Sequence, residues 1–201
     1  MILGIDQGTT GTRACMVDES GHIHAQAYAA HHQHTPRPGW VEHDLDEIWA
    51  CVVRVVGEVL ASSSERPRGI AIANQGETVA LCNRRTRRPL HRALVWQDTR
   101  TQAADASLAT DAAVAARVRD ETGLHLDAYF SAPKLRWLLD HASPSDDIAA
   151  GTLDAWLIDR LAGSPVTDPS TAARTLLYDT RALAWSPFLT GLFGVADRLL
   201  P

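Results

Sequence analysis

The sequence predicts an α/β fold from three features in chain order. A group of short strand patterns separated by turn residues comes first, one long amphipathic helix follows, and a further apolar strand pattern comes after it. The 201 residues allow one large domain or two small ones. With 45% hydrophobic and 21% charged residues, the chain has an ordinary globular composition and enough length for a sizeable core.

The first elements are short strands. Residues 2–5 form an apolar run that stops at residues 6–12, where two glycines and three threonines favour a turn. Residues 13–17 and 22–28 fit a second and a third strand, and residues 18–21 between them have the composition of a hairpin turn. The chain is therefore expected to open as a strand, a Gly/Thr loop and a hairpin.

A long helix is expected next, after a Pro/Gly break at residues 36–39. Asp44 is a candidate N-cap, and Glu47 stands three residues on as its capping-box partner. The apolar residues that follow repeat with the spacing of one face of a helix of about four turns. They are Leu45, Ile48, Trp49, Val52, Val56, Val59 and Leu60.

The rest of the chain alternates strand and helix patterns. Residues 69–73 predict a compact buried strand, and residues 79–82 and 90–96 predict two strands around a turn at 84–89. An Ala-rich stretch, residues 99–119, predicts a helix, and another helix is expected to begin at Ser131. Residues 152–161 predict a last helix, which Gly163 would end.

Charge and cysteine content exclude several classes of protein. Lys and Arg number 19 against 24 acids, so the net charge of −5 argues against nucleic acid as a partner. The three cysteines show no CxxC spacing, which disfavours a disulfide framework. The N-terminus does not resemble a signal peptide, and no stretch is apolar enough to span a bilayer. We therefore expect a cytoplasmic protein without a membrane partner.

Residues 4–13 form the most informative segment of the chain. A strand delivers the Asp6 carboxylate to a tight turn of glycines and threonines, whose N–H and hydroxyl groups can bind phosphate oxygens. The carboxylate could hold a hydrated Mg²⁺ ion nearby. The alternative is an ordinary hairpin turn, since neither GxxxxGK[ST] nor GxGxxG is present.

Four ordered segments resemble motifs of the FGGY family of carbohydrate kinases, most closely those of its glycerol kinases. The first is the Asp-Gln-Gly-Thr-Thr turn, and the second is Gly-Trp-Val-Glu-His-Asp at residues 39–44. The third is the pair of segments at residues 72–78 and 95–101. The fourth comprises residues 122–124 and 129–137, and similarity continues through residues 151–158 and 173–178.

The resemblance implies a ribonuclease-H-like domain of the actin-like ATPase superfamily, a mixed β-sheet flanked by helices. It identifies residues 1–201 as an N-terminal FGGY kinase domain that is incomplete at its C-terminal end. The family's catalytic base lies in a Gly-Asp-Gln segment, which does not occur in these residues. We therefore expect both that base and the second, nucleotide-binding domain to be absent.

The resemblance also implies roles for individual residues, with ATP and Mg²⁺ as cofactors. Asp6 matches the carboxylate near Mg²⁺, which it would hold through a metal-bound water. The positions that match contacts to the nucleotide phosphates are Thr9, Thr10, Gly11 and Arg13. The positions that match the polyol site are Gly76, Glu77, Trp96 and Tyr129. Carboxylates accept hydrogen bonds from hydroxyls, and aromatic faces cover carbon chains, so these residue types suit that task.

One position departs from the family pattern. Gly76 stands where glycerol kinases have an arginine, so a five-donor guanidinium is lost and nothing local in the sequence replaces it. Glycerol is therefore a first guess among polyols and sugars.

Three functions follow from the resemblance. In the first, the parent enzyme of this domain phosphorylates glycerol or a related polyol or sugar in carbohydrate metabolism. In the second, the chain is a catalytically inactive polyol- or phosphate-binding module, and in the third it is a half-enzyme that needs a separate second domain. The sequence leaves open whether the apolar residues between 188 and 201 fold or stay exposed; exposure would favour self-association, so a homo-oligomer is possible.

Other distinctive residues are expected to be structural. The histidines at 31, 32 and 34 lack a second ligand cluster for a metal. The four arginines of residues 84–88 are expected in a solvated loop, as are the charges of Asp146 and Asp147. The expected core residues are Cys82, Trp49, Trp137 and Trp156.

Overall fold

A computed structural model describes residues 1–143, 145 and 147–201, so the expected loop charge of Asp146 lies outside the described residues. The chain divides into two compact units. The first comprises Met1–His34 and His43–Gln75, and the second comprises Thr35–Glu42 and Gly76–Pro201. None of the helices in the described ranges is long and apolar enough to cross a membrane.

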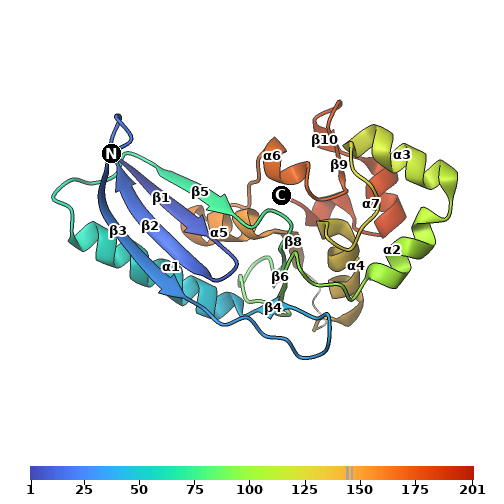
Figure 1. The fold of residues 1–201 in the computed structure, drawn as a ribbon, viewed down its shortest axis with the longest axis horizontal. Helices are drawn as coiled ribbons and strands as arrows, with labels where there is room; N and C mark the ends of the chain where they lie inside the picture. The colour runs from blue at the N-terminus through green and yellow to red at the C-terminus, as the bar shows by residue number, and fades with distance from the viewer. Residues whose placement is uncertain (144, 146) are drawn as a thin grey trace. The chain divides into compact units, whose positions relative to one another are not determined.

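The first unit is a four-stranded sheet with one helix on it (Figure 1). Its strands run in the order β3-β2-β1-β5, and β1 pairs antiparallel with β2 and parallel with β5. Their bounds are β1 Ile2–Gln7, β2 Gly11–Val17, β3 Ile23–Ala30 and β5 Ile70–Asn74. Helix α1, Leu45–Ala61, packs on β2 and β3. This order confirms the predicted meander, helix and further strand.

The prediction for β5 as a buried strand was wrong. Among the described residues β1 alone pairs with it, so β5 is an edge strand of this sheet, and Ile70 is 51% exposed. A short apolar run has the same composition at an edge as at the centre of a sheet, because sequence periodicity does not report how many neighbours a strand has.

Helix α1 begins where the sequence predicts, but its capping differs. Asp44 accepts hydrogen bonds from the backbone N–H groups of Asp46 and Glu47, which confirms the N-cap. The Glu47 carboxylate does not complete a capping box. Its Oε1 accepts from the backbone N and ring Nδ1 of His32, at 3.1 and 2.6 Å. Val55 is buried in place of the predicted Val56 and Leu60, and Leu60 is 40% exposed.

The second unit has a four-stranded sheet of order β4-β7-β6-β8 and a small hairpin of β9 and β10. The strands are β4 Glu42–His43, which crosses the unit boundary, β6 Val79–Asn83, β7 Ala93–Leu94, β8 Ile148–Thr152, β9 Tyr178–Asp179 and β10 Ala184–Trp185. The helices are α2 Gln102–Ala109, α3 Ala112–Thr122, α4 Ser131–His141, α5 Leu153–Ala162, α6 Pro169–Ala172 and α7 Pro187–Phe193, with a 3₁₀ turn at Asp197–Leu199.

Two predicted elements of this unit are only partly correct. The strand expected over residues 90–96 shrinks to β7, and before it only Pro89 makes an isolated bridge, to Cys82. The helix expected over residues 99–119 is broken in two. The break falls at Asp111, whose side chain accepts from the N–H groups of Ala113 and Val114 and so starts α3. The helices beginning at Ser131 and ending at Gly163 are confirmed.

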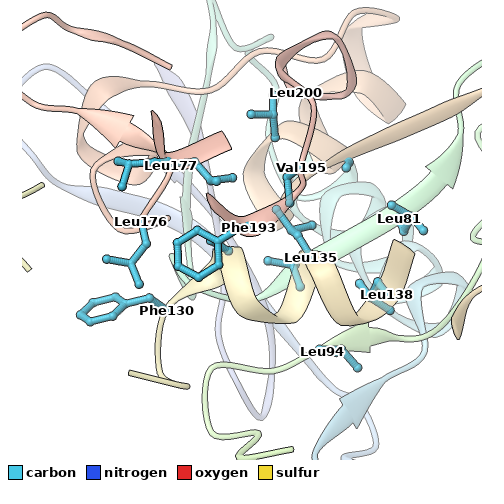
Figure 2. Close-up of a cluster of buried hydrophobic side chains, with 14 of the residues drawn as sticks. Leu81, Leu94, Phe130, Leu135, Leu138, Leu176, Leu177, Phe193, Val195 and Leu200 are labelled. Carbon is cyan, nitrogen blue, oxygen red and sulfur yellow. The ribbon is translucent and has the colours of Figure 1, made fainter. Parts of the chain in front are cut away.

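The hydrophobic core of the second unit surrounds helix α4 (Figure 2). Leu135 and Leu138 of α4 pack with Leu81 of β6 and Leu94 of β7. The C-terminal residues join the same cluster, since Leu189, Phe193 and Leu200 are 0%, 4% and 8% exposed. The structure thus answers the question that the sequence left open, because α7 packs on α4 and these apolar residues are buried in the core.

The predictions for core and loop residues are confirmed only in part. Cys82 and Trp156 are buried, as predicted. Two of the four loop arginines are held by the fold and not simply solvated, because Arg87 pairs with Asp159 at 3.1 Å and Arg84 donates to the Ile148 carbonyl at 3.1 Å.

Candidate functional site

The candidate phosphate turn is a tight connection between β1 and β2. Gln7 and Thr12 are the last register partners before the turn, and the Gly8 N–H donates to the Gly11 carbonyl at 3.0 Å. The buried Thr12 hydroxyl donates to Gln7 Oε1 at 2.6 Å. Residues 8–10 therefore project beyond a rigid base, as a loop that binds an anion requires.

Gly11 lets a neighbouring side chain reach the turn. The Tyr28 hydroxyl donates to the Thr10 carbonyl at 3.2 Å. A Cβ at position 11 would lie 2.5 Å from Tyr28 Cζ and 2.5 Å from the Ala29 carbonyl oxygen. Only glycine fits this approach, and the tyrosine consequently tethers the turn.

Asp6 and Arg13 lie directly opposite each other in the β1–β2 register, and both are exposed. Side chains opposite each other on paired strands share a face of the sheet. A carboxylate suits a hydrated divalent cation, and a guanidinium suits phosphate oxygens. The expected residues thus provide a donor set that fits Mg²⁺ and phosphate, although no group of three His, Cys, Asp or Glu side chains among the described residues could hold a metal directly.

A buried pair of histidines stands close to this turn, which sequence reasoning did not foresee. The rings of His31 and His43 meet edge to face at 4.6 Å between centroids. Gln7 Nε2 lies 3.0 Å from His31 Nε2, and Gln75 Nε2 lies 3.2 Å from His43 Nδ1. Both glutamine amides also donate to the Gly8 carbonyl, at 3.2 and 3.4 Å. The cluster therefore supports the start of the turn.

The surroundings of both histidines favour the neutral form. Burial lowers the pKa of His31, and burial together with the neighbouring His31 lowers the pKa of His43 to about 3. An uncharged ring nitrogen can accept from a glutamine amide, whereas a protonated one cannot. These residues therefore have a structural role at neutral pH.

The candidate polyol residues all belong to the second unit. Glu77 is 7% exposed, and its carbonyl accepts from Ser131 Oγ, the first residue of α4, at 3.2 Å. The next residue, Thr78, accepts from the backbone N–H of Trp96 at 3.2 Å. The Trp96 ring meets the Tyr129 ring at 5.5 Å and 61°. These contacts bring three distant segments together.

A hollow of about 290 Å³ adjoins the two rings, with polar side chains among its lining residues. It is lined by Trp96, Gln97, Asp98, Thr99, Gln102, Asp127, Ala128 and Tyr129. Polar groups beside aromatic faces suit a ligand with hydroxyls on a carbon chain.

A fully buried lysine fixes the loop that presents Tyr129. Lys134 Nζ donates to the carbonyls of Ala128, Tyr129 and Phe130, the latter two at 2.9 and 3.1 Å. Burial lowers the pKa of Lys134 to about 8, against the opposing effect of Asp98 and other carboxylates. The sequence did not predict that Lys134 holds this loop, because a lysine in a helix is usually a surface residue.

Arg100 joins three of the segments that resemble family motifs. Its guanidinium lies against the rings of both Trp40 and Trp137, at 3.7 and 4.3 Å from their centroids. It donates to Asp98 and to Glu42, both at 2.8 Å. Trp137 therefore packs against a cation as well as against the hydrophobic core, so the prediction that it is a core residue is only partly correct.

An arginine side chain from another part of the chain lies beside Gly76. A Cβ at Gly76 would lie 3.8 Å from Arg174 Cγ, and Arg174 Nε donates to Glu77 Oε1 at 2.7 Å. Nothing local in the sequence takes the place of the family's arginine, as expected, but the fold brings Arg174 to this position from far along the chain. The sequence held one indication that Arg174 could matter, because this residue falls within residues 173–178, a segment that resembles the FGGY kinases.

Residues 1–201 match the N-terminal domain of the FGGY family of carbohydrate kinases. The chain belongs to this family. It is similar to the glycerol kinase of Dechloromonas aromatica, with 43% identity over 211 residues that cover all of this chain and 42% of that protein. The glycerol kinase of Methylorubrum extorquens is 47% identical over 211 residues, covering 98% of this chain and 42% of its own length.

Solved structures agree with this assignment. The Plasmodium falciparum glycerol kinase crystallised with ADP superposes with a TM-score of 0.90 and 32% identity, covering all of this chain and 42% of that one. The xylulose kinase of Rhodospirillum rubrum gives a TM-score of 0.89 and 25% identity, covering 99% of this chain and 41% of that one. These relatives have the actin-like, ribonuclease-H-like fold, which confirms the predicted fold class. The chain spans less than half the length of the relatives it matches.

Proposed function

We propose that this chain is the substrate-side N-terminal domain of a kinase that transfers a phosphoryl group from ATP to glycerol or a related polyol or sugar. In this proposal the domain spans residues 1–201 and is completed, with its second nucleotide-binding domain, by residues outside the present sequence. The carboxylate base of the reaction would also lie there, because these residues contain no Gly-Asp-Gln segment.

One observation supports the proposal most strongly, namely the cluster of Glu77, Trp96 and Tyr129, of which the two aromatic residues line a hollow. A carboxylate accepts hydrogen bonds from hydroxyl groups and holds them in a fixed direction. The two rings, set at an angle, offer an apolar wall to the C–H groups of the same molecule. This combination orients a polyol so that one hydroxyl can be presented for transfer.

The first unit would hold the phosphate end of the nucleotide. Thr9, Thr10 and Gly11 would contact its oxygens, Arg13 would offset their charge, and Asp6 would bind a water of Mg²⁺. When bound, Mg²⁺ neutralises developing charge on the transferred group. The chain's own contribution is the rigid turn that orients these donors.

A binding panel tests the proposal. Calorimetric titration of the chain with glycerol, erythritol, xylitol and gluconate is expected to give saturable binding to at least one of them. Glu77→Gln removes the charge without changing shape and should weaken that binding by about tenfold or more. Glu65→Gln, on an exposed loop, is the matched control. Absence of binding by the wild-type chain, or equal binding by the Glu77→Gln variant, would refute the proposed site.

Phosphoryl transfer from labelled ATP separates the three functions. We expect the 201-residue chain to bind polyol without turnover, whereas turnover by the chain alone would contradict the need for a second domain. Fusion to the remaining part of the Dechloromonas aromatica glycerol kinase should produce turnover if the chain is a functional half. Continued inactivity of a folded fusion would favour a binding module.

A further inference from the structure

The Arg174 side chain lies beside two neighbouring residues of the candidate polyol site. Its Nε donates to Glu77 Oε1 at 2.7 Å, and its Cγ lies 3.8 Å from the place of a Cβ on Gly76. Arg174 therefore flanks the Glu77 carboxylate and lies beside the position where residue 76 has no side chain.

The ion pair leaves most of the guanidinium for other acceptors. Guanidinium has five N–H donors; the contact with Glu77 uses the one on Nε, and a hydrogen bond with the Tyr129 side chain engages another. The Glu77 side chain is 9% exposed and that of Arg174 is 38% exposed, so the arginine is the partner that reaches toward solvent. A ligand that meets the carboxylate therefore meets this cation too.

Aromatic rings fix the position of the guanidinium. Arg174 Cζ lies 5.7 Å from the centroid of Tyr129 and 5.0 Å from that of Phe130. Burial lowers the pKa of Arg174, but hydrogen bonds and charge from Glu77 and Tyr129 outweigh it and raise the pKa overall. The side chain is consequently a permanent, oriented cation.

We propose that Arg174 determines substrate specificity by forming, with Glu77, a paired receptor for a vicinal diol. One hydroxyl donates to the Glu77 carboxylate, and the adjacent hydroxyl accepts from an Nη group of Arg174. A hydroxyl can do either, whereas the carboxylate only accepts and the guanidinium only donates. This inference rests on the proposed polyol site and specifies which residue supplies its donor.

The pairing has a chemical consequence for the ligand. Two hydroxyls on adjacent carbons can each meet one member of an ion pair in direct contact, while hydroxyls separated by an extra carbon fit this spacing less well. Glycerol contains vicinal hydroxyls, and propane-1,3-diol has the same carbon count without them. The wild-type chain should therefore prefer glycerol over propane-1,3-diol.

Titration of Arg174 variants tests the inference. Arg174→Gln should weaken binding of the tightest ligand among glycerol, erythritol and xylitol by about tenfold or more, since it removes a charged hydrogen-bond donor. It should also abolish the preference for glycerol over propane-1,3-diol, which a purely structural role would not change. Arg174→Lys keeps the charge without the planar fork and should give an intermediate affinity.

Arg181→Gln is the matched control, because Arg181 forms an exposed ion pair with Asp120 in the same unit. This variant should bind as wild type does. If Glu77→Gln loses affinity while both Arg174 variants keep wild-type affinity and diol preference, the inference is wrong and the proposed function stands. If Glu77→Gln and wild type behave alike, or neither binds, both are wrong. Should Arg174→Gln fail to fold, the lysine variant alone decides.

Discussion

Gly11 shows how much a single missing side chain contributes to the candidate phosphate turn. Any Cβ there would overlap the Tyr28 ring and the Ala29 carbonyl. We expect Gly11→Ala to reduce the free energy of unfolding by about 1–3 kcal/mol, the usual cost of overpacking. Urea unfolding followed by circular dichroism measures this change.

The control for that substitution is Gly57→Ala, within helix α1. Apart from the backbone of the helix itself and the neighbouring residues, no heavy atom of the described chain lies within 4 Å of a Cβ built at Gly57. Alanine should stabilise the helix there by about 0.5–1 kcal/mol. Equal effects of the two substitutions would show that the close approach of Tyr28 is not a real constraint.

The histidine pair predicts how stability depends on pH. The pKa of His43 falls from 6.5 in the unfolded chain to about 3 in the fold, and that of His31 shifts the same way. Between these values the unfolded chain binds more protons, so the stabilisation is complete above pH 6.5 and is lost as the pH falls toward 3. Groups around His43 include His31, His34 and Glu47.

His43→Gln isolates this contribution. The variant should show a flatter dependence of the unfolding free energy between pH 6.5 and 4 than the wild-type chain, by up to about 1.4 kcal/mol per pH unit for one group. Asp105 is unchanged in both proteins, and its raised pKa of about 6 has the opposite sign, so only the difference between the two curves is informative. Identical curves would contradict a neutral buried His43.

At the residue scale, sequence reasoning found side chains with distinctive chemistry and missed their partners. Glu77, Trp96 and Tyr129 were expected together, and the fold joins them through Thr78 and Arg174. Arg174 stands 97 positions from Glu77, and no periodicity relates residues so far apart. Whether these residues bind a polyol stays a prediction.

At the scale of elements, local signals predicted well where one residue decides the geometry. Asp44 starts α1 and Gly163 ends α5 in the left-handed conformation. Elements that depend on tertiary neighbours were missed or misjudged, namely the edge position of β5, the whole of β8 and the burial of α7. Periodicity reports an apolar face but not the element that covers it.

Capping of α1 provides a prediction at this scale. Asp44→Ala removes the acceptor of two backbone N–H groups and should cost about 1 kcal/mol of unfolding free energy. Glu47→Ala removes only the contact with His32, which is an exposed pair, and should cost less. Thermal or urea unfolding of both variants tests the order. A larger loss of unfolding free energy for Glu47→Ala would contradict this order and would favour the capping box that the sequence predicted.

For the molecule as a whole, the two candidate sites fall in different compact units. The phosphate turn belongs to the first unit, and the polyol cluster belongs to the second. The chain belongs to the FGGY kinases and spans 42% of the length of the glycerol kinases it resembles. The proposal that follows is a domain that binds substrate and completes its chemistry only with a second domain.

The central claim is that a polyol binds at the Glu77 cluster, and the six tryptophans allow a direct measurement. In an NMR titration with the tightest polyol of the panel, the indole N–H resonance of Trp96, assigned with Trp96→Phe, should shift saturably. Trp49, the tryptophan of the first unit, should not shift. If a saturating polyol leaves the Trp96 resonance unchanged, or shifts the Trp49 resonance instead, the claim that the polyol binds at the Glu77 cluster is contradicted.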